Sequence, residues 1–304
     1  MSAPELNSIS IPTNGIRLHA KTSGPEDGRL VILLHGFPEF WFGWHRQIEP
    51  LSQVGYHVIV PDQRGYNLSD KPRPVSAYEI DQLANDVIGI IHFFGREKAV
   101  IAGHDWGAAV AWYLAMHYPD KVERLIIANV PHQAAFKRAI QKPVWKQLRK
   151  SLYFFFFQIP FFPEWGMAQE GYSRLKKVMI NTSRPGTFSE DDLKRYDAAW
   201  SQPGALTGGL NWYRAMMRLG SQYSSEKSNR IFHQRITVPT LVLWGNQDAF
   251  IEPFLADWSM EWVDQGKLIR FENAGHWVLH EEAEKVNQTI LDYLQDGHSS
   301  LLLF

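Results

Sequence analysis

The sequence predicts an α/β protein with a mostly parallel, doubly wound sheet and a helical cap inserted into it. Two observations predict this fold class. Short, near-continuous apolar runs alternate with helix-like stretches, and this alternation stops over about 100 residues in the middle of the chain. Such runs are typical of parallel strands that are covered on both faces. A chain of 304 residues is long enough for one large domain that carries an insertion.

Six apolar runs are expected to be strands, and the stretches between them include helices. The expected strands are Leu30–Leu34, His57–Pro61, Ala99–Ala102, Arg124–Asn129, Thr240–Trp244 and Lys267–Phe271. The expected helices include Ile80–Phe94, Gly107–His117 and Glu281–Leu294. No strand pattern stands out from about Pro131 to Arg235. We therefore expect a core domain of residues 1–131 and 236–304 and a helical cap of residues 132–235, placed over the carboxyl ends of the strands, where such sheets bind ligands.

The composition argues against several kinds of chemistry. The chain has no cysteine, which removes disulfides, thiolate metal sites and a cysteine nucleophile. Its formal net charge of −1 gives no indication of nucleic acid or of an anionic membrane. No apolar run approaches the roughly 20 residues that span a bilayer, and the first residues lack a signal-peptide pattern. We expect a cytoplasmic protein without a metal or cofactor; its oligomeric state is not indicated.

A Gly-His-Asp-Trp-Gly segment, Gly103–Gly107, carries the central motif and directly follows the run Ala99–Ala102. A sharp strand-to-helix turn with small flanking residues projects its middle side chain above the sheet at a helix N-terminus, where negative charge is favoured. In esterases that residue is Ser, but here it is Asp105. A carboxylate can displace a leaving group from saturated carbon and form an enzyme ester. The alternative is that Asp105 only caps the following helix.

Hydrolysis of such an ester needs a base, for which His276 is the candidate, and an acid to orient it, for which Asp248 is the candidate. Each follows an expected strand, and the chain order of nucleophile, acid and histidine is that of α/β hydrolases. Neutral His276 would take a proton from the water that attacks the Asp105 carbonyl carbon. The alternatives are a structural histidine and a turn aspartate.

The oxyanion created by that attack needs hydrogen-bond donors. The expected donors are the backbone N–H groups of Trp106 and of Phe37. Phe37 belongs to the His-Gly-Phe-Pro segment His35–Pro38, which we expect to be a tight turn whether or not it has this role.

Together these motifs resemble those of the α/β-hydrolase-fold epoxide hydrolases, of the soluble epoxide hydrolase kind. The matching pieces run from near residue 30 to the last helix: His35–Pro38, Asp62–Tyr66, Gly103–Gly107, Asp248 and His276. The resemblance implies the α/β-hydrolase fold, and the aspartate nucleophile narrows the activity to epoxide hydrolases and dehalogenases. An epoxide hydrolase would open a small apolar epoxide with water to a vicinal diol, without a cofactor.

The resemblance also implies two lid tyrosines whose hydroxyls hold the epoxide oxygen, because the alkoxide that leaves needs a proton or a hydrogen bond. Tyr213, within Asn211–Arg214, matches the second, and Tyr153, five positions before Gln158, matches the first. Both could also be ordinary core tyrosines. The pocket is expected to be aromatic and apolar, lined by Phe37, Pro38, Trp106, Phe156, Trp212 and Trp277.

Two rival functions remain open at this stage. A haloalkane dehalogenase would use the same nucleophile, with Trp106 and a second N–H donor for the halide. In one subgroup that donor is an Asn where this chain has Phe37, and in another it is a lid tryptophan, for which Trp165 and Trp212 are available. Fluoroacetate dehalogenases have an Arg where this chain has Trp106, which argues against that activity.

The second rival function is that of a hydrolase-fold protein that binds ligands without turnover. In this chain, however, every catalytic position is filled.

Overall fold

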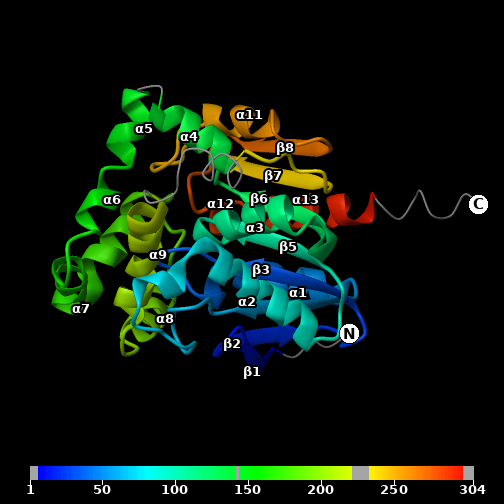
Figure 1. The fold of residues 1–304 in the computed structure, drawn as a ribbon, viewed down its shortest axis with the longest axis horizontal. Helices are drawn as coiled ribbons and strands as arrows, with labels where there is room; N and C mark the ends of the chain where they lie inside the picture. Colours follow the sequence, from blue (N-terminus) through cyan, green and yellow to red (C-terminus); the bar gives the residue numbers. More distant parts are fainter. Residues whose placement is uncertain (1–5, 142–143, 221–232, 297–304) are drawn as a thin grey trace, which may run out of the picture.

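An eight-stranded sheet forms the centre of the protein (Figure 1). The computed structural model describes residues 6–141, 144–220 and 233–296. The strand order is β1-β2-β4-β3-β5-β6-β7-β8, with β1 and β2 antiparallel and the other six parallel to one another. The strands are β1 (Asn7–Thr13), β2 (Ile16–Ser23), β3 (Arg29–Leu34), β4 (Tyr56–Pro61), β5 (Ala99–His104), β6 (Val122–Ala128), β7 (Thr240–Gly245) and β8 (Gly266–Phe271).

All six predicted strands are confirmed, with ends that differ from the prediction by at most two residues. The hairpin β1–β2 was not predicted. Its turn is Asn14-Gly15, where both residues have positive φ, of 41° and 76°. Asn-Gly is the favoured sequence of such tight hairpin turns, so a local signal for the hairpin was present.

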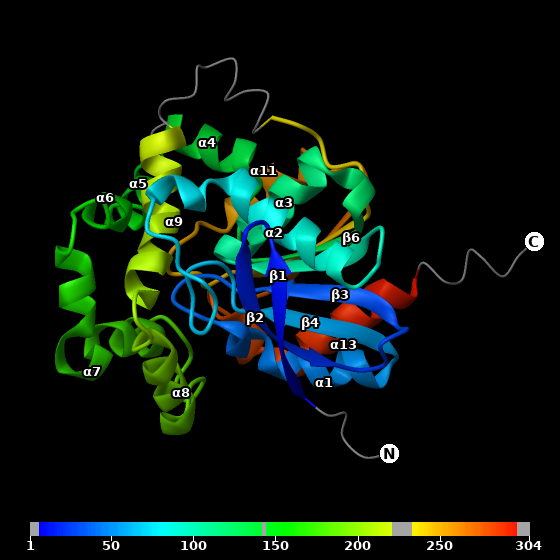
Figure 2. The same ribbon diagram turned by 60° about the horizontal axis from the view of Figure 1, so that its bottom comes forward.

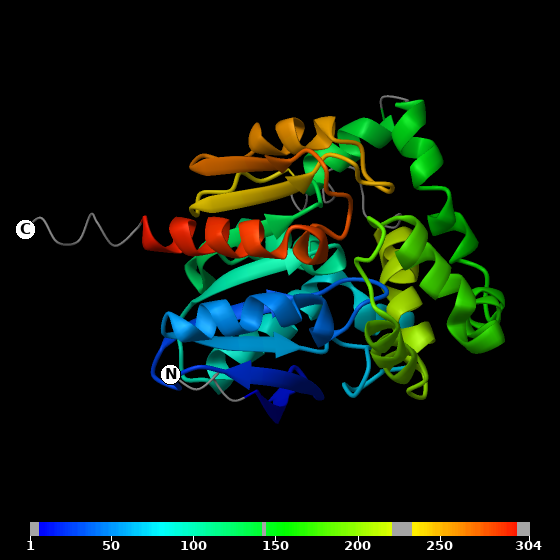
Figure 3. The same cartoon turned by 180° about the vertical axis from the view of Figure 1, so that it is seen from behind.

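Helices cover both faces of the sheet, because alternate residues of each strand point to opposite sides. On one face, Ile32, Ile101 and Ile127 pack into a cluster with residues of α2, α3 and α11. On the other, neighbouring strand residues such as Val31 and Val100 pack with α1, α12 and α13, and Figure 3 shows α1 and α13 on that side. These helices are α1 (His45–Gln53), α2 (Ile80–Phe93), α3 (Trp106–His117), α11 (Phe254–Met260), α12 (Val278–Glu281) and α13 (Ala283–Gln295).

The expected helical insertion is present as a layer at one end of the sheet (Figure 2). It contains α4 (Gln133–Gln141), α5 (Trp145–Lys150), α6 (Tyr153–Phe156), α7 (Phe162–Asn181), α8 (Glu190–Trp200) and α9 (Ala205–Gly220). Three short 3-10 helices lie outside this insertion: η1 (Trp41–Trp44), η2 (Val75–Tyr78) and η3 (Pro119–Lys121). α4 packs Ala135 and Ala139 into the cluster of the core sheet. The division at residues 131/132 and 235/236 therefore stays a prediction. Within the described ranges, no helix is long and apolar enough to cross a membrane.

Candidate active site

Asp105 lies at the sharp turn between β5 and α3. Its φ of 50° and ψ of −125° are rarely adopted by a residue with a side chain, which is the strain expected of a nucleophile elbow. Gly107 must be glycine because a Cβ there would lie 2.1 Å from the backbone oxygen of Leu34. The strained turn leaves the Asp105 carboxylate at the N-terminus of α3, where the helix dipole places partial positive charge.

A backbone amide contacts the Asp105 carboxylate directly. The N–H of Phe37 donates to Asp105 Oδ1 over 2.7 Å. This approach needs glycine at the preceding position, because a Cβ on Gly36 would lie 2.2 Å from the same oxygen. Trp106, the other predicted oxyanion donor, is the first residue of α3, and the amide of a first helical residue has no partner within its helix.

His276 lies between two carboxylates. Its Nδ1 is 2.8 Å from Asp248 Oδ2, and its Nε2 is 3.5 Å from Asp105 Oδ2. Burial alone would lower the pKa of His276, but the charge of Asp248 and the hydrogen bonds to Asp105 and Asp248 outweigh it and raise the pKa to about 10. In the resting protein, His276 is therefore an imidazolium that faces the Asp105 carboxylate.

Asp248 is held in place by four hydrogen bonds. Its Oδ1 accepts from the N–H groups of Phe250 (2.7 Å) and Ile251 (2.9 Å), and its Oδ2 accepts from His276 and from Asn129 Nδ2 (2.7 Å). Burial alone would raise the pKa of Asp248, but the His276 charge and these hydrogen bonds lower it. Asp248 therefore remains ionised and fixes the tautomer of His276.

Asn129 was not predicted as a site residue. It directly follows β6 with a φ of 50°, donates to Asp248, and accepts from the N–H of Gly245 over 2.7 Å. It thereby ties the carboxyl end of β6 to that of β7, where the loop bearing Asp248 begins. A polar residue directly after the apolar run Leu125–Ala128 was the signal that could have identified it.

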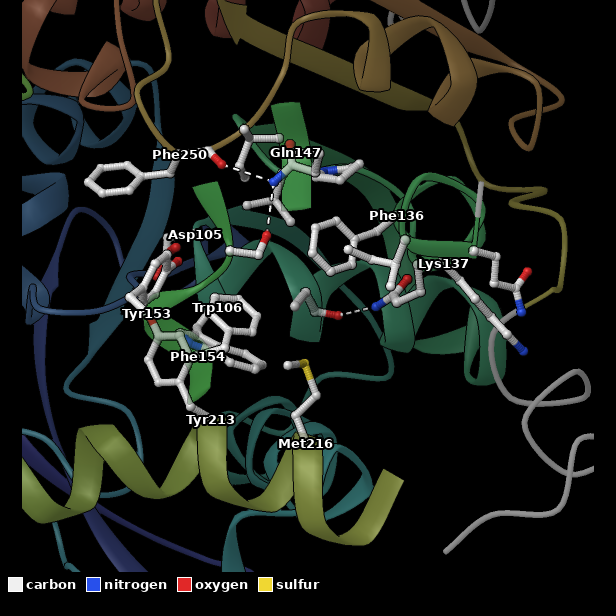
Figure 4. Close-up of a pocket in the computed structure, with 18 residues that line it drawn as sticks. Asp105, Trp106, Phe136, Lys137, Gln147, Tyr153, Phe154, Tyr213, Met216 and Phe250 are labelled. Atoms are coloured by element: carbon white, nitrogen blue, oxygen red, sulfur yellow. Dashed lines mark hydrogen bonds between the residues drawn. The ribbon is translucent and has the colours of Figure 1, made fainter. Parts of the chain in front are cut away.

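Tyr153 on α6 and Tyr213 on α9 face Asp105 from the cap. Their rings lie edge to face with centroids 5.9 Å apart, and both residues share one cavity wall with Asp105 (Figure 4). Burial raises the pKa of both hydroxyls well above the usual value, and the charge of Asp105 adds to the increase. Both hydroxyls are therefore protonated and can donate hydrogen bonds.

The cavity above Asp105 has a volume of about 500 Å³, which is within the range of small-molecule sites. Asp105, Tyr153 and Tyr213 lie at one end of it, and Phe136 and Lys137 lie toward the other (Figure 4). Its remaining wall is largely apolar: Trp106, Ala109, Val130, Pro131, Gln133, Ile140, Gln141, Gln147, Ser151, Phe154, Met216, Phe250 and Ile251. The cavity suits an elongated apolar molecule whose reacting carbon is next to Asp105.

Comparisons with known proteins agree with this geometry. Residues 29–283 match the alpha/beta hydrolase fold family. The AB hydrolase superfamily protein YfhM of Bacillus subtilis is 47% identical over 288 residues, covering 94% of this chain and 97% of that protein. Human Epoxide hydrolase 4 is 35% identical over 305 residues, covering 97% of this chain and 81% of that protein. A crystal structure of Bacillus megaterium epoxide hydrolase with an inhibitor has a TM-score of 0.84 at 31% identity, covering 94% of this chain and all of that one.

The chain belongs to the epoxide hydrolase family of the α/β-hydrolase fold. The AB hydrolase superfamily protein is named only by its fold, so the relatives called epoxide hydrolases carry the more specific information.

In this member of the epoxide hydrolase family, the residues that line the cavity differ from those predicted from the sequence. Of the six predicted lining residues, the structure places Trp106 on the cavity wall, but not Phe37, Pro38, Phe156, Trp212 or Trp277. Phe37 instead packs edge-on against Tyr213, with ring centroids 5.6 Å apart, and Phe156 points outward and is exposed. Phe156 and Trp212 lie on cap helices, and the side of such a helix that faces the cavity is set by packing between helices, which residue type alone does not show. Phe37, Pro38 and Trp277 lie on loops after β3 and β8.

The other three residues hold the cap and the catalytic loops together. Trp212 donates its indole N–H to the backbone oxygen of Arg64 over 2.9 Å, and Trp277 donates to Thr182 Oγ1 over 2.9 Å. The oxygen of Pro38 accepts from the indole of Trp200 on α8 over 2.6 Å.

A buried carboxylate, Glu39, links the cap to the catalytic loops and was not predicted. Its Oε1 is 2.7 Å from the Tyr196 hydroxyl of α8 and 2.8 Å from His280 Nε2, and its Oε2 is 3.2 Å from His104 Nδ1. His104 Nε2 lies 2.8 Å from the backbone oxygen of His276. Burial alone would raise the pKa of Glu39, but the His280 charge and the two histidine hydrogen bonds hold it well below its usual range. Glu39 is a positioning residue for the His276 loop.

Proposed function

We propose that this protein hydrolyses an apolar epoxide to a vicinal diol through an ester at Asp105. The supporting observation is that two protonated tyrosine hydroxyls line the same cavity wall as an aspartate nucleophile. An opening epoxide leaves an alkoxide, which is a poor leaving group unless it receives a proton or a hydrogen bond. Tyr153 and Tyr213 supply that donor. The relatives named as epoxide hydrolases support the same substrate class.

The first half of the reaction forms the ester. An Asp105 oxygen bonds to an epoxide carbon while the carbon–oxygen bond of the epoxide breaks, and the freed oxygen takes a proton from a tyrosine hydroxyl. Esterification removes the negative charge that faces His276 Nε2. The pKa of His276 then falls, and its imidazolium returns a proton to the tyrosinate. His276 is thereby neutral when the second half begins.

The second half hydrolyses the ester. His276 takes a proton from water as the water oxygen bonds to the Asp105 carbonyl carbon, and the N–H groups of Phe37 and Trp106 hold the oxyanion. Collapse breaks the ester bond, and the diol oxygen takes the proton from His276. The Asp105 carboxylic acid returns its own proton to His276, which restores the resting ion pair.

Because the charge of Asp105 helps to raise the pKa of His276, removing that charge should lower this pKa. The Asp105→Asn substitution should lower the pKa of His276 below about 10, because both the charge and the hydrogen bond of Asp105 contribute to that value. Titration of the His276 ring by NMR measures it. A pKa that stays at about 10 would show that Asp248 alone sets it, and the proposed release of the proton on esterification would be wrong.

Halide release is the second candidate activity, and the placement of the tryptophans argues against it. The indole N–H of Trp212 is bonded to the backbone oxygen of Arg64, and Trp165 is 57% exposed at the outer surface of the cap. Neither side chain lies on the cavity wall beside Trp106. The site therefore has tyrosine hydroxyls where a dehalogenase needs a second N–H donor.

The product of an assay distinguishes these functions. We expect incubation with styrene oxide, an aryl epoxide, to yield the vicinal diol, while a bromoalkane yields no free bromide under the same conditions. Gas chromatography measures the diol, and a colorimetric halide assay measures bromide. Bromide release without diol would make the protein a dehalogenase. The absence of both products over a broad panel would favour a ligand-binding protein.

A further inference from the structure

The cap carries a strong local charge that the net charge of the whole chain conceals. From residue 133 to residue 181 the sequence has nine Lys or Arg residues and two Glu residues, for a net charge of +7 in a chain whose total is −1. Part of this charge is paired with residues outside the segment. Arg214 contacts both carboxylate oxygens of Glu164 at 2.7 and 3.1 Å, and Arg138, Lys150 and Lys176 form salt bridges with Glu261, Glu252 and Asp197. The bases outside these pairs give this part of the surface its attraction for anions.

The same segment exposes apolar side chains along α6 and the start of α7. We call this group the cap apolar patch: Leu152, Phe155, Phe156, Ile159, Phe161, Phe162 and Trp165, all exposed. Phe161 is 83% exposed, and ring contacts join Phe156 to Phe162 (6.3 Å) and Phe162 to Trp165 (5.7 Å). Apolar groups of this kind usually mark a surface that binds a partner or a membrane.

The patch lies on the outer edge of the molecule. In Figures 1 and 2, α9 lies between the sheet and the helices α6 and α7, which form the side of the cap away from the core. The inner sides of this segment are already packed, because Phe157 and Met167 are buried in a hydrophobic cluster with Leu210 and Tyr213 of α9. The exposed residues therefore form a second apolar face, with no contact in the described chain that would bury it.

Basic side chains flank the patch on both sides. Lys146 and Arg149 precede it on α5, and Arg174 and Lys177 follow it on α7. All four are exposed, and none has a salt bridge to a described residue. Glu170 is the remaining acid of the segment. Aromatic and aliphatic side chains bordered by Lys and Arg are the composition of surfaces that insert into the interface of anionic membranes.

We propose that the cap apolar patch docks on an anionic lipid surface, with its aromatic side chains inserted at the headgroup level and the flanking bases against the lipid phosphates. A second copy of the chain is a poorer occupant, because a symmetric contact would bring the exposed bases Lys146, Arg149, Arg174 and Lys177 of two copies together. The proposal rests on the outer surface of the cap and not on the proposed function. Its test measures binding and is independent of turnover.

Co-sedimentation with vesicles tests the proposal on the full-length protein. We expect the protein to pellet with phosphatidylcholine vesicles that contain phosphatidylglycerol, and much less with phosphatidylcholine alone. The Lys146→Gln/Arg149→Gln variant should bind the anionic vesicles about 30-fold more weakly, from about fivefold for each base near the surface. Phe161→Ser should weaken binding about tenfold, because it removes an inserted aromatic ring.

Phe93→Ser is the matched control, since Phe93 is also an exposed phenylalanine but lies on α2 of the core, and its binding should equal that of the wild type. Wild-type protein that stays in the supernatant with anionic vesicles would overturn the proposal, as would a Phe161→Ser variant that binds as well as wild type. Sedimentation velocity adds a third check. A wild-type dimer that Phe161→Ser converts to a monomer would show that a second copy covers the patch.

Discussion

Replacing His276 by Gln should leave the enzyme able to form its ester and unable to release it. In the proposed mechanism, the Asp105 carboxylate attacks without a base, but hydrolysis of the ester needs the Nε2 atom of His276, which lies 3.5 Å from Asp105 Oδ2. Loss of a general base costs about 10²–10⁴ in rate, so turnover should fall by at least that factor. Intact-protein mass spectrometry after incubation with the epoxide should show one added substrate mass, and peptide mapping should place it on Asp105.

The control for this trapping experiment is Asp105→Ala in the His276→Gln background. It removes the nucleophile, and we expect no adduct with the same epoxide. If His276→Gln alone gives no adduct while its fold is intact by circular dichroism, water attacks the epoxide directly and the ester at Asp105 does not form. An adduct that persists without Asp105 would place the nucleophile elsewhere.

Removing both lid hydroxyls should slow formation of the ester. The double variant Tyr153→Phe/Tyr213→Phe keeps the rings that line the cavity but leaves the departing epoxide oxygen without a donor, which should cost about 10²–10⁴ in rate. Each single variant should lose less, because one hydroxyl remains. Stopped-flow or quenched-flow measurement of the first turnover isolates this step from hydrolysis.

Tyr66→Phe is the matched control for the tyrosine variants. Tyr66 is also buried, with its ring edge-on to Trp212 at 5.6 Å, yet its hydroxyl has no hydrogen-bond partner in the described structure and the residue does not line the cavity. Its removal should leave the first turnover close to the wild-type rate. A double variant that forms the ester within a few-fold of wild type would mean that the tyrosines do not assist the leaving oxygen.

The part of the fold that the sequence predicts best is the parallel part of the sheet. Strands that are buried on both faces are mostly apolar, so β3, β4, β5 and β7 and the Leu125–Ala128 part of β6 are visible as near-continuous runs. β1 lies at the edge of the sheet and alternates between exposed and buried residues, which makes a weaker pattern. Only the Asn14-Gly15 turn identifies the hairpin locally.

The catalytic residues of the site could also be predicted from the sequence, but the residues of its cavity wall could not. Asp105, Asp248 and His276 each follow a strand, so their proximity could be predicted from the order of strands in a doubly wound sheet. The residues of the cavity wall could not be predicted in this way. The segment Phe154–Phe157 consists of four phenylalanines, so no polar residue shows which side of it faces solvent. The structure turns Phe154 toward the cavity and Phe155 and Phe156 toward solvent. The sequence places Glu39 and His104 beside the catalytic loops but could not give Glu39 a role, because its partners, Tyr196, His280 and His104, are distant in the sequence.

The amide of Phe37 gives the turn at His35–Pro38 a property that catalytic side chains lack. A backbone N–H is the same in every residue except proline, so mutation of residue 37 or 106 to other residues can change ring size and polarity while the donor atom persists. Gly36 cannot vary in this way, because its hydrogen is all that fits against the carboxylate. Directed evolution should therefore find glycine fixed at position 36, while substitutions of Trp106, whose side chain lines the cavity, change which molecules are accepted and leave the amide donors in place.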